Sequence, residues 1–296
     1  MSTNNRNVPI RRILGQALDG AMQWRLWLLW IGASLACALI AALPAWNWLA
    51  ASLNNSVHAP AIASDKAPVL LLDLLLSRNA PLGVIGEGTR IAAILMLLLS
   101  PLLAGATIAA IRSHTRLGFG DLLRGATAEY GPMLRMLVWS VVPLGLALLV
   151  MSVIIGANEK AHEHAILASD ANTGRNIAFL VGGVLFVLAH ASLEAGRGWL
   201  ATDGRLRSAL KAWWRGVKLL CRRPVAVLLA WLVTTVLGLA LALLFAYLRQ
   251  FAGGAGVGGF LLAILLGCGI AAGLAWGRIA RLYAMSALAA DMHARR

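Results

Sequence analysis

The stretch 225–248, VAVLLAWLVTTVLGLALALLFAYL, decides the fold class, because it runs for 24 residues without a charged side chain. A helix of this length is about 36 Å long, enough to cross a hydrocarbon core of about 30 Å. Five further apolar stretches resemble it. The six predicted spans are 26–43, 91–111, 136–155, 177–195, 225–248 and 260–276. We therefore expect an all-α, polytopic membrane bundle of six transmembrane helices.

The composition of the 296 residues excludes an ordinary water-soluble enzyme. Apolar residues make up 60% and charged residues 13% of the chain, against about 45–50% and about 25% in soluble domains. Three cysteines are too few for a disulfide-stapled module. We expect residues 1–296 to form a single integral membrane domain, with the first span retained rather than cleaved as a signal peptide.

The basic residues lie almost entirely on one side of the predicted bundle. Six crossings place both termini on the same side, and that side holds 20 of the 26 lysines and arginines. The twelve acidic residues divide evenly between the two sides, so the net charge of +14 belongs to one face. The positive-inside rule makes this face, including an interfacial helix within residues 1–25, cytoplasmic. The expected location is the bacterial inner membrane.

The strong positive charge suggests two kinds of partner. Nucleic acid is the usual partner of a strongly basic soluble domain. In this chain, however, the basic residues lie at the ends of the spans, where anionic lipid headgroups attract them. We therefore expect lipid and no nucleic acid.

A related five-residue sequence precedes spans one, three and five. The three copies read ALDGA, LLRGA and WWRGV, with their glycines at Gly20, Gly125 and Gly216. We predict three helical-hairpin repeats, each an amphipathic helix followed by a span out, an outer loop and a span back. Parallel repeats of this kind are arranged around an axis along the membrane normal.

The third amphipathic segment has the clearest pattern. Its basic stripe, at helical spacing, contains Arg207, Lys211, Arg215, Lys218 and Arg222. Its predicted apolar stripe contains Leu206, Leu210, Trp213, Val217 and Leu220 or Cys221. A helix with these two stripes is expected to lie in the membrane interface. The second copy is weaker, and we expect Pro132 to break it.

The chain resembles the YciC-type six-helix bacterial inner-membrane proteins, and it is similar to the membrane domain of some glycerophosphoryl diester phosphodiesterases. The residues that carry the resemblance are the fourth span, the sequence DGRLRSAL at 203–210 and RIARLY at 278–283. The resemblance implies the six-helix layout. It implies no activity, because the phosphodiesterase catalytic domain has no counterpart in this chain.

Glu194 is the most informative polar residue, because it lies near the inner end of the fourth span with His190 and Arg197 on the same helical face. Ionisable residues at membrane depth normally face other helices and find partners there. Arg278 and Arg281 lie at a similar depth in the sixth span. We predict an ion pair of Glu194 with one of these two arginines, either as a structural contact or as a proton relay or substrate anchor.

Small residues and prolines predict where helices approach or bend. Gly269, Gly273 and Gly277 form one stripe on the sixth span, which favours close packing within the chain or in a homo-oligomer. Pro44 is expected to end the first span. Residues 44–90 are expected to form an outer loop with a short amphipathic segment at 69–76.

The expected function is that of a non-catalytic membrane scaffold or accessory subunit that contacts anionic lipid or a protein partner. The alternative is a small permease for a lipid-related or small anionic solute. No HExxH, GxSxG, P-loop or CxxC pattern occurs, so we expect no enzyme, cofactor or metal site. The few polar residues within the spans, which favour the scaffold, are Thr107, Ser140, Ser152, Thr234 and Thr235. A wide polar cavity at mid-membrane would favour the permease.

Overall fold

The computed structural model describes residues 8–63, 68–77, 80–113, 115–162, 168–252 and 256–295, and no strand occurs within these ranges. Within these ranges, six helices are long and apolar enough to cross a membrane. They are α2 (Trp24–Leu53), α5 (Leu82–Arg112), α6 (Phe119–Ala161), α7 (Ala168–Thr202), α9 (Pro224–Gln250) and α10 (Val257–His293). The all-α class with six apolar helices is confirmed, and the chain is a multi-pass membrane protein.

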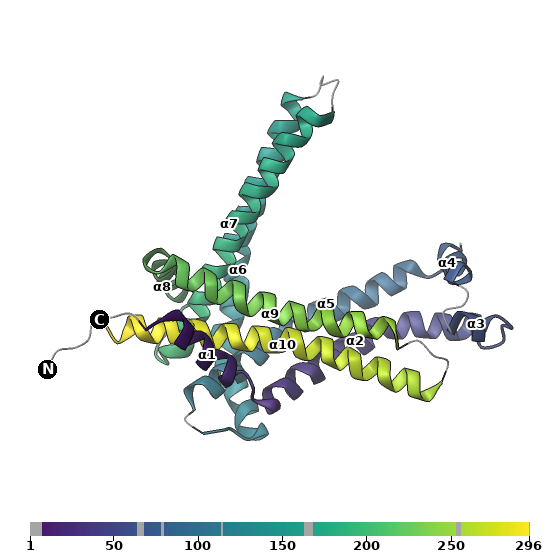
Figure 1. Ribbon diagram of the computed structural model, residues 1–296, viewed down its shortest axis with the longest axis horizontal. Helices are drawn as coiled ribbons and strands as arrows, with labels where there is room; N and C mark the ends of the chain where they lie inside the picture. Colours follow the sequence, from purple (N-terminus) through teal and green to yellow (C-terminus); the bar gives the residue numbers. More distant parts are fainter. Residues whose placement is uncertain are drawn as a thin grey trace.

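Four shorter helices mark the two ends of the molecule. The helices α1 (Ile10–Gly20) and α8 (Ala209–Arg222) lie at the end where both chain termini are found, which we call the basic end (Figure 1). The helices α3 (Ala59–Ala63) and α4 (Pro68–Leu76) lie at the opposite end, which we call the loop end (Figure 1). The helices α2, α5, α9 and α10 run between these two ends, whereas α6 and α7 run from the basic end in a different direction (Figure 1).

The long helices form three antiparallel hairpins, in the order α2/α5, α6/α7 and α9/α10. The α6/α7 hairpin leaves the basic end at a steep angle to the other four helices (Figure 1). Helix α10 contacts α2 and α7 in addition to its partner α9, so it joins the three hairpins. The predicted arrangement of three hairpin repeats is therefore present.

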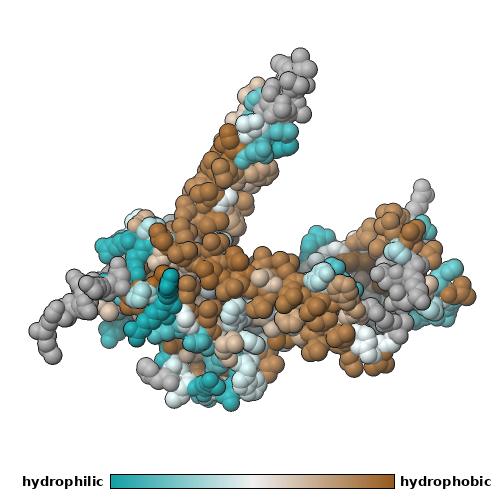
Figure 2. All heavy atoms as spheres, in the orientation of Figure 1, coloured by the Kyte–Doolittle hydropathy of each residue, from teal (hydrophilic) through white to brown (hydrophobic). Residues whose placement is uncertain are grey.

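The packed core lies at the basic end. It combines large buried side chains of α1, α7, α8 and the second half of α10, among them Ile13, Trp199, Leu219 and Met285. Away from the basic end the long helices expose their apolar side chains, and Leu180 of α7 is 68% exposed. Figure 2 shows this apolar surface along the hairpins and hydrophilic side chains around the basic end. Lipid is the solvent that such a surface requires.

The three repeat glycines occupy equivalent packing positions. A methyl group at Gly20 would lie 2.7 Å from the ring of Tyr283, and one at Gly125 or Gly216 would collide with Ala109 or Gly196. The three contacted residues, 109, 196 and 283, are separated by 87 residues each. Each repeat glycine thus packs on the second helix of another hairpin: α6 on α5, α8 on α7 and α1 on α10. This cyclic order closes the three repeats around one axis.

Two predicted helix breaks are wrong. Helix α2 continues through Pro44 to Leu53, so the outer connection is shorter than 44–90, and α4 accounts for its predicted amphipathic segment. Helix α6 continues through Pro132 and joins the second amphipathic segment directly to its span. Neighbouring helices allow proline inside a membrane helix, and Gly88 of α5 packs closely against the Pro44 ring.

The predicted apolar stripe of α8 is also wrong in part. Leu206 and, of the two alternatives, Leu220 are buried as predicted, whereas Leu210 is 53% exposed. Ala212, Gly216 and Leu219, which the prediction did not include, are also buried. The buried face of α8 is rotated away from the predicted stripe because α8 contacts α7, and Gly216 is the position at which the α7 backbone can approach most closely. Packing on a protein neighbour, rather than hydrophobic periodicity alone, sets which face of α8 is covered.

The glycine stripe of α10 faces α9 within the same chain. A methyl group on Gly277 would lie 2.9 Å from the carbonyl oxygen of Thr234, and one on Gly273 would lie 2.9 Å from the nitrogen of Ala242. Gly269 approaches the ring of Phe245. The two helices therefore cross at backbone contact, as small residues permit in membranes.

We predict that Gly216→Ala destabilises the protein by about 1–3 kcal/mol through overpacking against α7. The control is Gly183→Ala, because a methyl group at this exposed position of α7 meets nothing within 4 Å. Alanine should be neutral or slightly stabilising there, since glycine is the weaker helix former. Thermal unfolding in detergent measures both variants. Equal melting temperatures would contradict the repeat contact.

Candidate functional site

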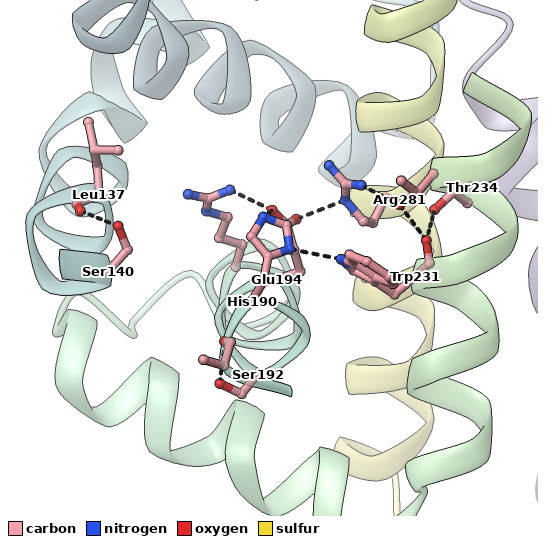
Figure 3. Close-up of polar contacts among 11 residues, drawn as sticks. Leu137, Ser140, His190, Ser192, Glu194, Trp231, Thr234 and Arg281 are labelled. Carbon is pink, nitrogen blue, oxygen red and sulfur yellow. Dashed lines mark hydrogen bonds and ion pairs between the residues drawn. The ribbon is translucent and has the colours of Figure 1, made fainter. Parts of the chain in front are cut away.

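Glu194 lies at the centre of a polar cluster near the basic end of α7. The residue is 4% exposed, and it lies eight residues before the end of the helix, a distance of about 12 Å. Its Oε1 atom accepts a hydrogen bond of 2.6 Å from Nη1 of Arg197, and its Oε2 atom lies 3.5 Å from Nε of Arg281 (Figure 3). Both carboxylate oxygens are therefore engaged by arginines.

Helix α9 supports this cluster from one side. The indole Nε1 of Trp231 donates to Nδ1 of His190 at 2.8 Å (Figure 3), and Nη1 of Arg281 donates to Oγ1 of Thr235 at 2.8 Å. Because Nδ1 of His190 accepts, the neutral ring carries its proton on Nε2. That nitrogen lies 3.9 Å from Glu194, a distance that is too long for a hydrogen bond. The cluster thus joins α7, α9 and α10.

Of the two predicted arginine partners, Arg281 contacts Glu194 and Arg278 does not. The Arg278 guanidinium instead lies over the ring of Trp30 on α2, 5.4 Å from its centroid. Among the described residues, no carboxylate lies within 4.0 Å of it. The carboxylate of Glu194 is therefore in direct contact with Arg197 and Arg281, and not with Arg278.

A cavity of about 220 Å³ opens beside the Glu194 cluster. Side chains of α2, α5, α6, α7 and α10 line it, including all three arginines, His190 and Glu194. Three lining residues, Thr107, Glu194 and Arg281, are 87 residues apart and occupy the same position in the three repeats. The cavity thus lies where the second helices of the three hairpins converge. The 87-residue offset of these helices was a signal that the sequence analysis missed.

The basic stripe of α8 divides into exposed and paired residues. Arg207, Lys211, Lys218 and Arg222 are exposed. Arg215, in contrast, donates to Asp203 at 2.8 Å and lies over the ring of Trp199. This hydrogen bond holds the pKa of the Asp203 carboxyl below its ordinary value. Arg207 also lies 3.9 Å from Glu129 and donates to the carbonyl oxygen of Ala128 at 3.3 Å. Lys211, Lys218 and Arg222 are therefore the stripe residues most open to lipid or another protein.

The sequence analysis missed two ion pairs at the basic end whose carboxylates are largely buried. Arg112 at the end of α5 pairs with Glu129 of α6 at 2.7 Å and donates to the carbonyl oxygens of Leu200 and Ala201. Arg223, before α9, pairs with Asp291 of α10 at 2.6 Å. The signal for the first was Glu129, an acidic residue within a mostly apolar packing face. The first pair connects α5 to α6, and the second connects the start of α9 to α10.

The chemistry available at this site is anion binding. The cavity lining contains three arginines and one carboxylate, so it carries a net positive charge. In the part of the chain that the structure describes, no group of three or more histidine, cysteine, aspartate or glutamate side chains could hold a metal ion.

Comparisons with protein-family models, curated proteins and solved structures find no match to this chain. The resemblance to the YciC-type proteins therefore stays a prediction from the sequence.

We predict that Glu194→Gln destabilises the protein by about 3 kcal/mol, because it leaves Arg197 and Arg281 without their buried counter-charge. The control, Glu87→Gln, removes the carboxylate of an exposed pair with Arg90 and should change stability by less than about 1 kcal/mol. Thermal unfolding in detergent compares the two.

A double variant tests whether the loss comes from the ion pair. Glu194→Gln combined with Arg281→Gln should destabilise less than the sum of the two single changes, because the charges disappear together. Additive losses would mean that Glu194 and Arg281 are not energetically coupled.

Proposed function

We propose that this protein is a non-catalytic scaffold or accessory subunit of the bacterial inner membrane, with its basic end in the cytoplasm. The observation that carries the proposal is the row of exposed cations on α8, beside six apolar helices. Basic residues next to a membrane surface attract anionic lipid, with about 1 kcal/mol per lysine or arginine. The basic end would hold anionic headgroups, or an acidic protein partner, against the membrane.

The hydroxyl groups within the spans favour the scaffold over a permease. Each of the five bonds to a backbone carbonyl of its own helix, as Thr107 does to Leu103 at 3.0 Å and Ser152 to Leu149 at 2.8 Å. Hydroxyls bonded in this way do not form a polar path along the bundle. The polar cavity lies beside the basic ends of the spans.

A permease for an anionic or lipid-related solute is the alternative. The arginine-lined cavity favours it, since transporter sites lie where structural repeats meet. Such a permease must also release its ligand at the loop end, where the helices expose apolar side chains. We rank the scaffold first because the hydroxyl groups within the spans form no polar path by which a ligand could reach the loop end.

The proposed orientation predicts how cysteines react in cells. Cys221 on α8 is exposed, so a Cys37→Ala/Cys268→Ala variant should react with a membrane-impermeant maleimide only after the inner membrane is opened. In a cysteine-free background, Val57→Cys at the loop end, 88% exposed, should react in intact spheroplasts. The reverse pattern would overturn the orientation.

The lipid-holding role predicts that anionic lipid stabilises the protein through α8. Nanodiscs with phosphatidylglycerol should raise the free energy of unfolding, measured by thermal unfolding, above that in phosphatidylcholine. Lys211→Gln/Arg222→Gln should reduce this gain by about 1 kcal/mol per residue removed. The control, Lys160→Gln/Arg175→Gln, removes two exposed charges at the end of the α6/α7 hairpin that lies away from the basic end and should keep the gain. A gain unchanged in the α8 variant would contradict the role of α8.

A reconstitution into closed proteoliposomes separates the scaffold from a permease. Proteoliposomes that contain a lipid with a fluorescent, dithionite-reducible headgroup should lose only the outer-leaflet signal if the lipid is held. Loss of the signal from both leaflets would favour the permease.

A further inference from the structure

We propose that the arginine-lined cavity and an adjoining apolar groove form one site for a single anionic phospholipid. Its phosphate would lie at Arg278 and one acyl chain would lie between α2 and α10. This inference deepens the proposed function, since it names a lipid class and the residues that select it. The site is separate from the exposed cations of α8, so each can be tested without the other.

The first argument is the unbalanced charge of the cavity. Glu194 uses one carboxylate oxygen for Arg197 and the other for Arg281. The side chain of Arg278 is exposed, and its guanidinium makes its one recorded contact, among the described residues, with the face of Trp30. That contact leaves the guanidinium N–H donors unused. At the edge of a membrane, unsatisfied donors are unfavourable, and a phosphate oxygen pair matches the planar fork of arginine.

The second argument is the groove that begins where the cavity ends. It has a volume of about 660 Å³ and is lined mainly by apolar side chains of α2 and α10, such as Leu39 and Ile264. Trp30 and Arg278 line both the groove and the cavity. The two spaces are therefore neighbours, with the arginine at their shared boundary.

The dimensions of the groove fit an acyl chain. Along α10 it extends from Phe260 to Arg278, which is about 27 Å at the rise of a helix. One leaflet contributes about 15 Å to the hydrocarbon core, so the groove is long enough for a lipid chain. The cavity volume of about 220 Å³ is several times the roughly 30 Å³ of one water molecule, which leaves room for a phosphate group.

The position of Arg278 fits the depth of a headgroup. It follows directly after the apolar stretch 260–276 of α10 and lies towards the basic end. A lipid whose phosphate met Arg278 would direct its chain along the groove towards the loop end. With the basic end in the cytoplasm, this is the orientation of a lipid in the inner leaflet.

The combination of the two spaces selects the ligand. A free phosphate would occupy the cavity and leave the groove without a role, whereas a neutral lipid would occupy the groove without matching the arginines. A zwitterionic lipid would bring a cationic ammonium group towards three arginines. A phospholipid with a net negative charge satisfies both spaces, and basic pockets between membrane helices bind such headgroups in other proteins.

Native mass spectrometry of the full-length protein in detergent tests the proposal. After delipidation, the protein is titrated separately with phosphatidylglycerol, phosphatidylcholine, glycerol phosphate and inorganic phosphate. We expect one tightly retained phosphatidylglycerol, with phosphatidylcholine bound at least about tenfold more weakly and neither soluble phosphate retained. Arg278→Gln should weaken phosphatidylglycerol binding about tenfold. The matched control Arg175→Gln removes an exposed arginine of α7 that lines neither the cavity nor the groove and does not belong to α8, and it should leave the binding unchanged.

A second variant blocks the groove without touching the arginines. Gly267 lines the groove, and a Cβ atom added there meets nothing within 4 Å. A tryptophan at this position can therefore leave the backbone without a clash at Cβ, and Gly267→Trp should displace the acyl chain from the groove. Its control is Gly183→Trp, which adds the same side chain at an exposed position of α7. We expect Gly267→Trp to lose the retained lipid and Gly183→Trp to keep it.

Several outcomes would overturn the two-part site. Equal retention of phosphatidylglycerol and phosphatidylcholine, or unchanged phosphatidylglycerol binding in Arg278→Gln, would show that Arg278 does not select the lipid by its charge. Retention of inorganic phosphate or glycerol phosphate that disappears in Arg278→Gln would identify a free-anion site instead. Unchanged lipid binding in Gly267→Trp would show that the acyl chain does not lie in the groove. If Arg278→Gln does not fold, Gly267→Trp and the comparison of the two lipids still test the two-part site.

The α8 variant Lys211→Gln/Arg222→Gln tests the proposed function separately, because it leaves the cavity and groove intact.

Discussion

The structure depends on an uneven distribution of packing along the membrane helices. Lipid chains are as apolar as leucine, so the hydrophobic effect does not drive one span against another. The three hairpins accordingly expose their apolar side chains over much of their length, and the α6/α7 hairpin diverges from the rest (Figures 1 and 2). Close packing is concentrated at the basic end, where α1 and α8 fill the space between helix ends. This end fixes the relative positions of the hairpins.

Glycine and arginine hold the basic end together in different ways. Gly20, Gly125 and Gly216 let each amphipathic segment reach the second helix of another hairpin. Arg112 and Arg223 then tie helix ends through buried carboxylates and free carbonyl groups. The glycines set the distance between helices, whereas the ion pairs penalise any separation that would leave a charge unpaired.

The same arrangement places a charged cavity between the repeats. Equivalent positions in the three second helices carry Thr107, Glu194 and Arg281, so the repeats share geometry but differ in chemistry. Glu194 satisfies two of the three arginines and leaves Arg278 facing the groove between α2 and α10. A structural ion pair and a ligand site are therefore parts of one cluster. The ion pairs of Glu194 hold α7 and α10 together, and the proposed ligand site uses the positive charge of Arg278.

The amino-acid sequence by itself determined the features that depend on composition and local periodicity. Uninterrupted apolar runs such as 225–248 specify membrane helices because their backbone groups must bond within the segment, and the position of the basic residues specifies which end carries the charge. The sequence also identified Glu194 as a residue in need of a cationic partner, and it supplied both candidates. These features follow from a single helix and its solvent.

Only the tertiary structure decided which residues meet. Arg278 and Arg281 are three residues apart and so point about 60° apart around α10. The rotation of α10 against α7 and α2 therefore places Arg281 beside Glu194 and Arg278 over the ring of Trp30. The continuation of the helices through Pro44 and Pro132, the rotation of α8 and the groove beside Arg278 likewise depend on neighbouring helices. Sequence periodicity describes the face of one helix, whereas the contact between two faces depends on the rotation and spacing of both.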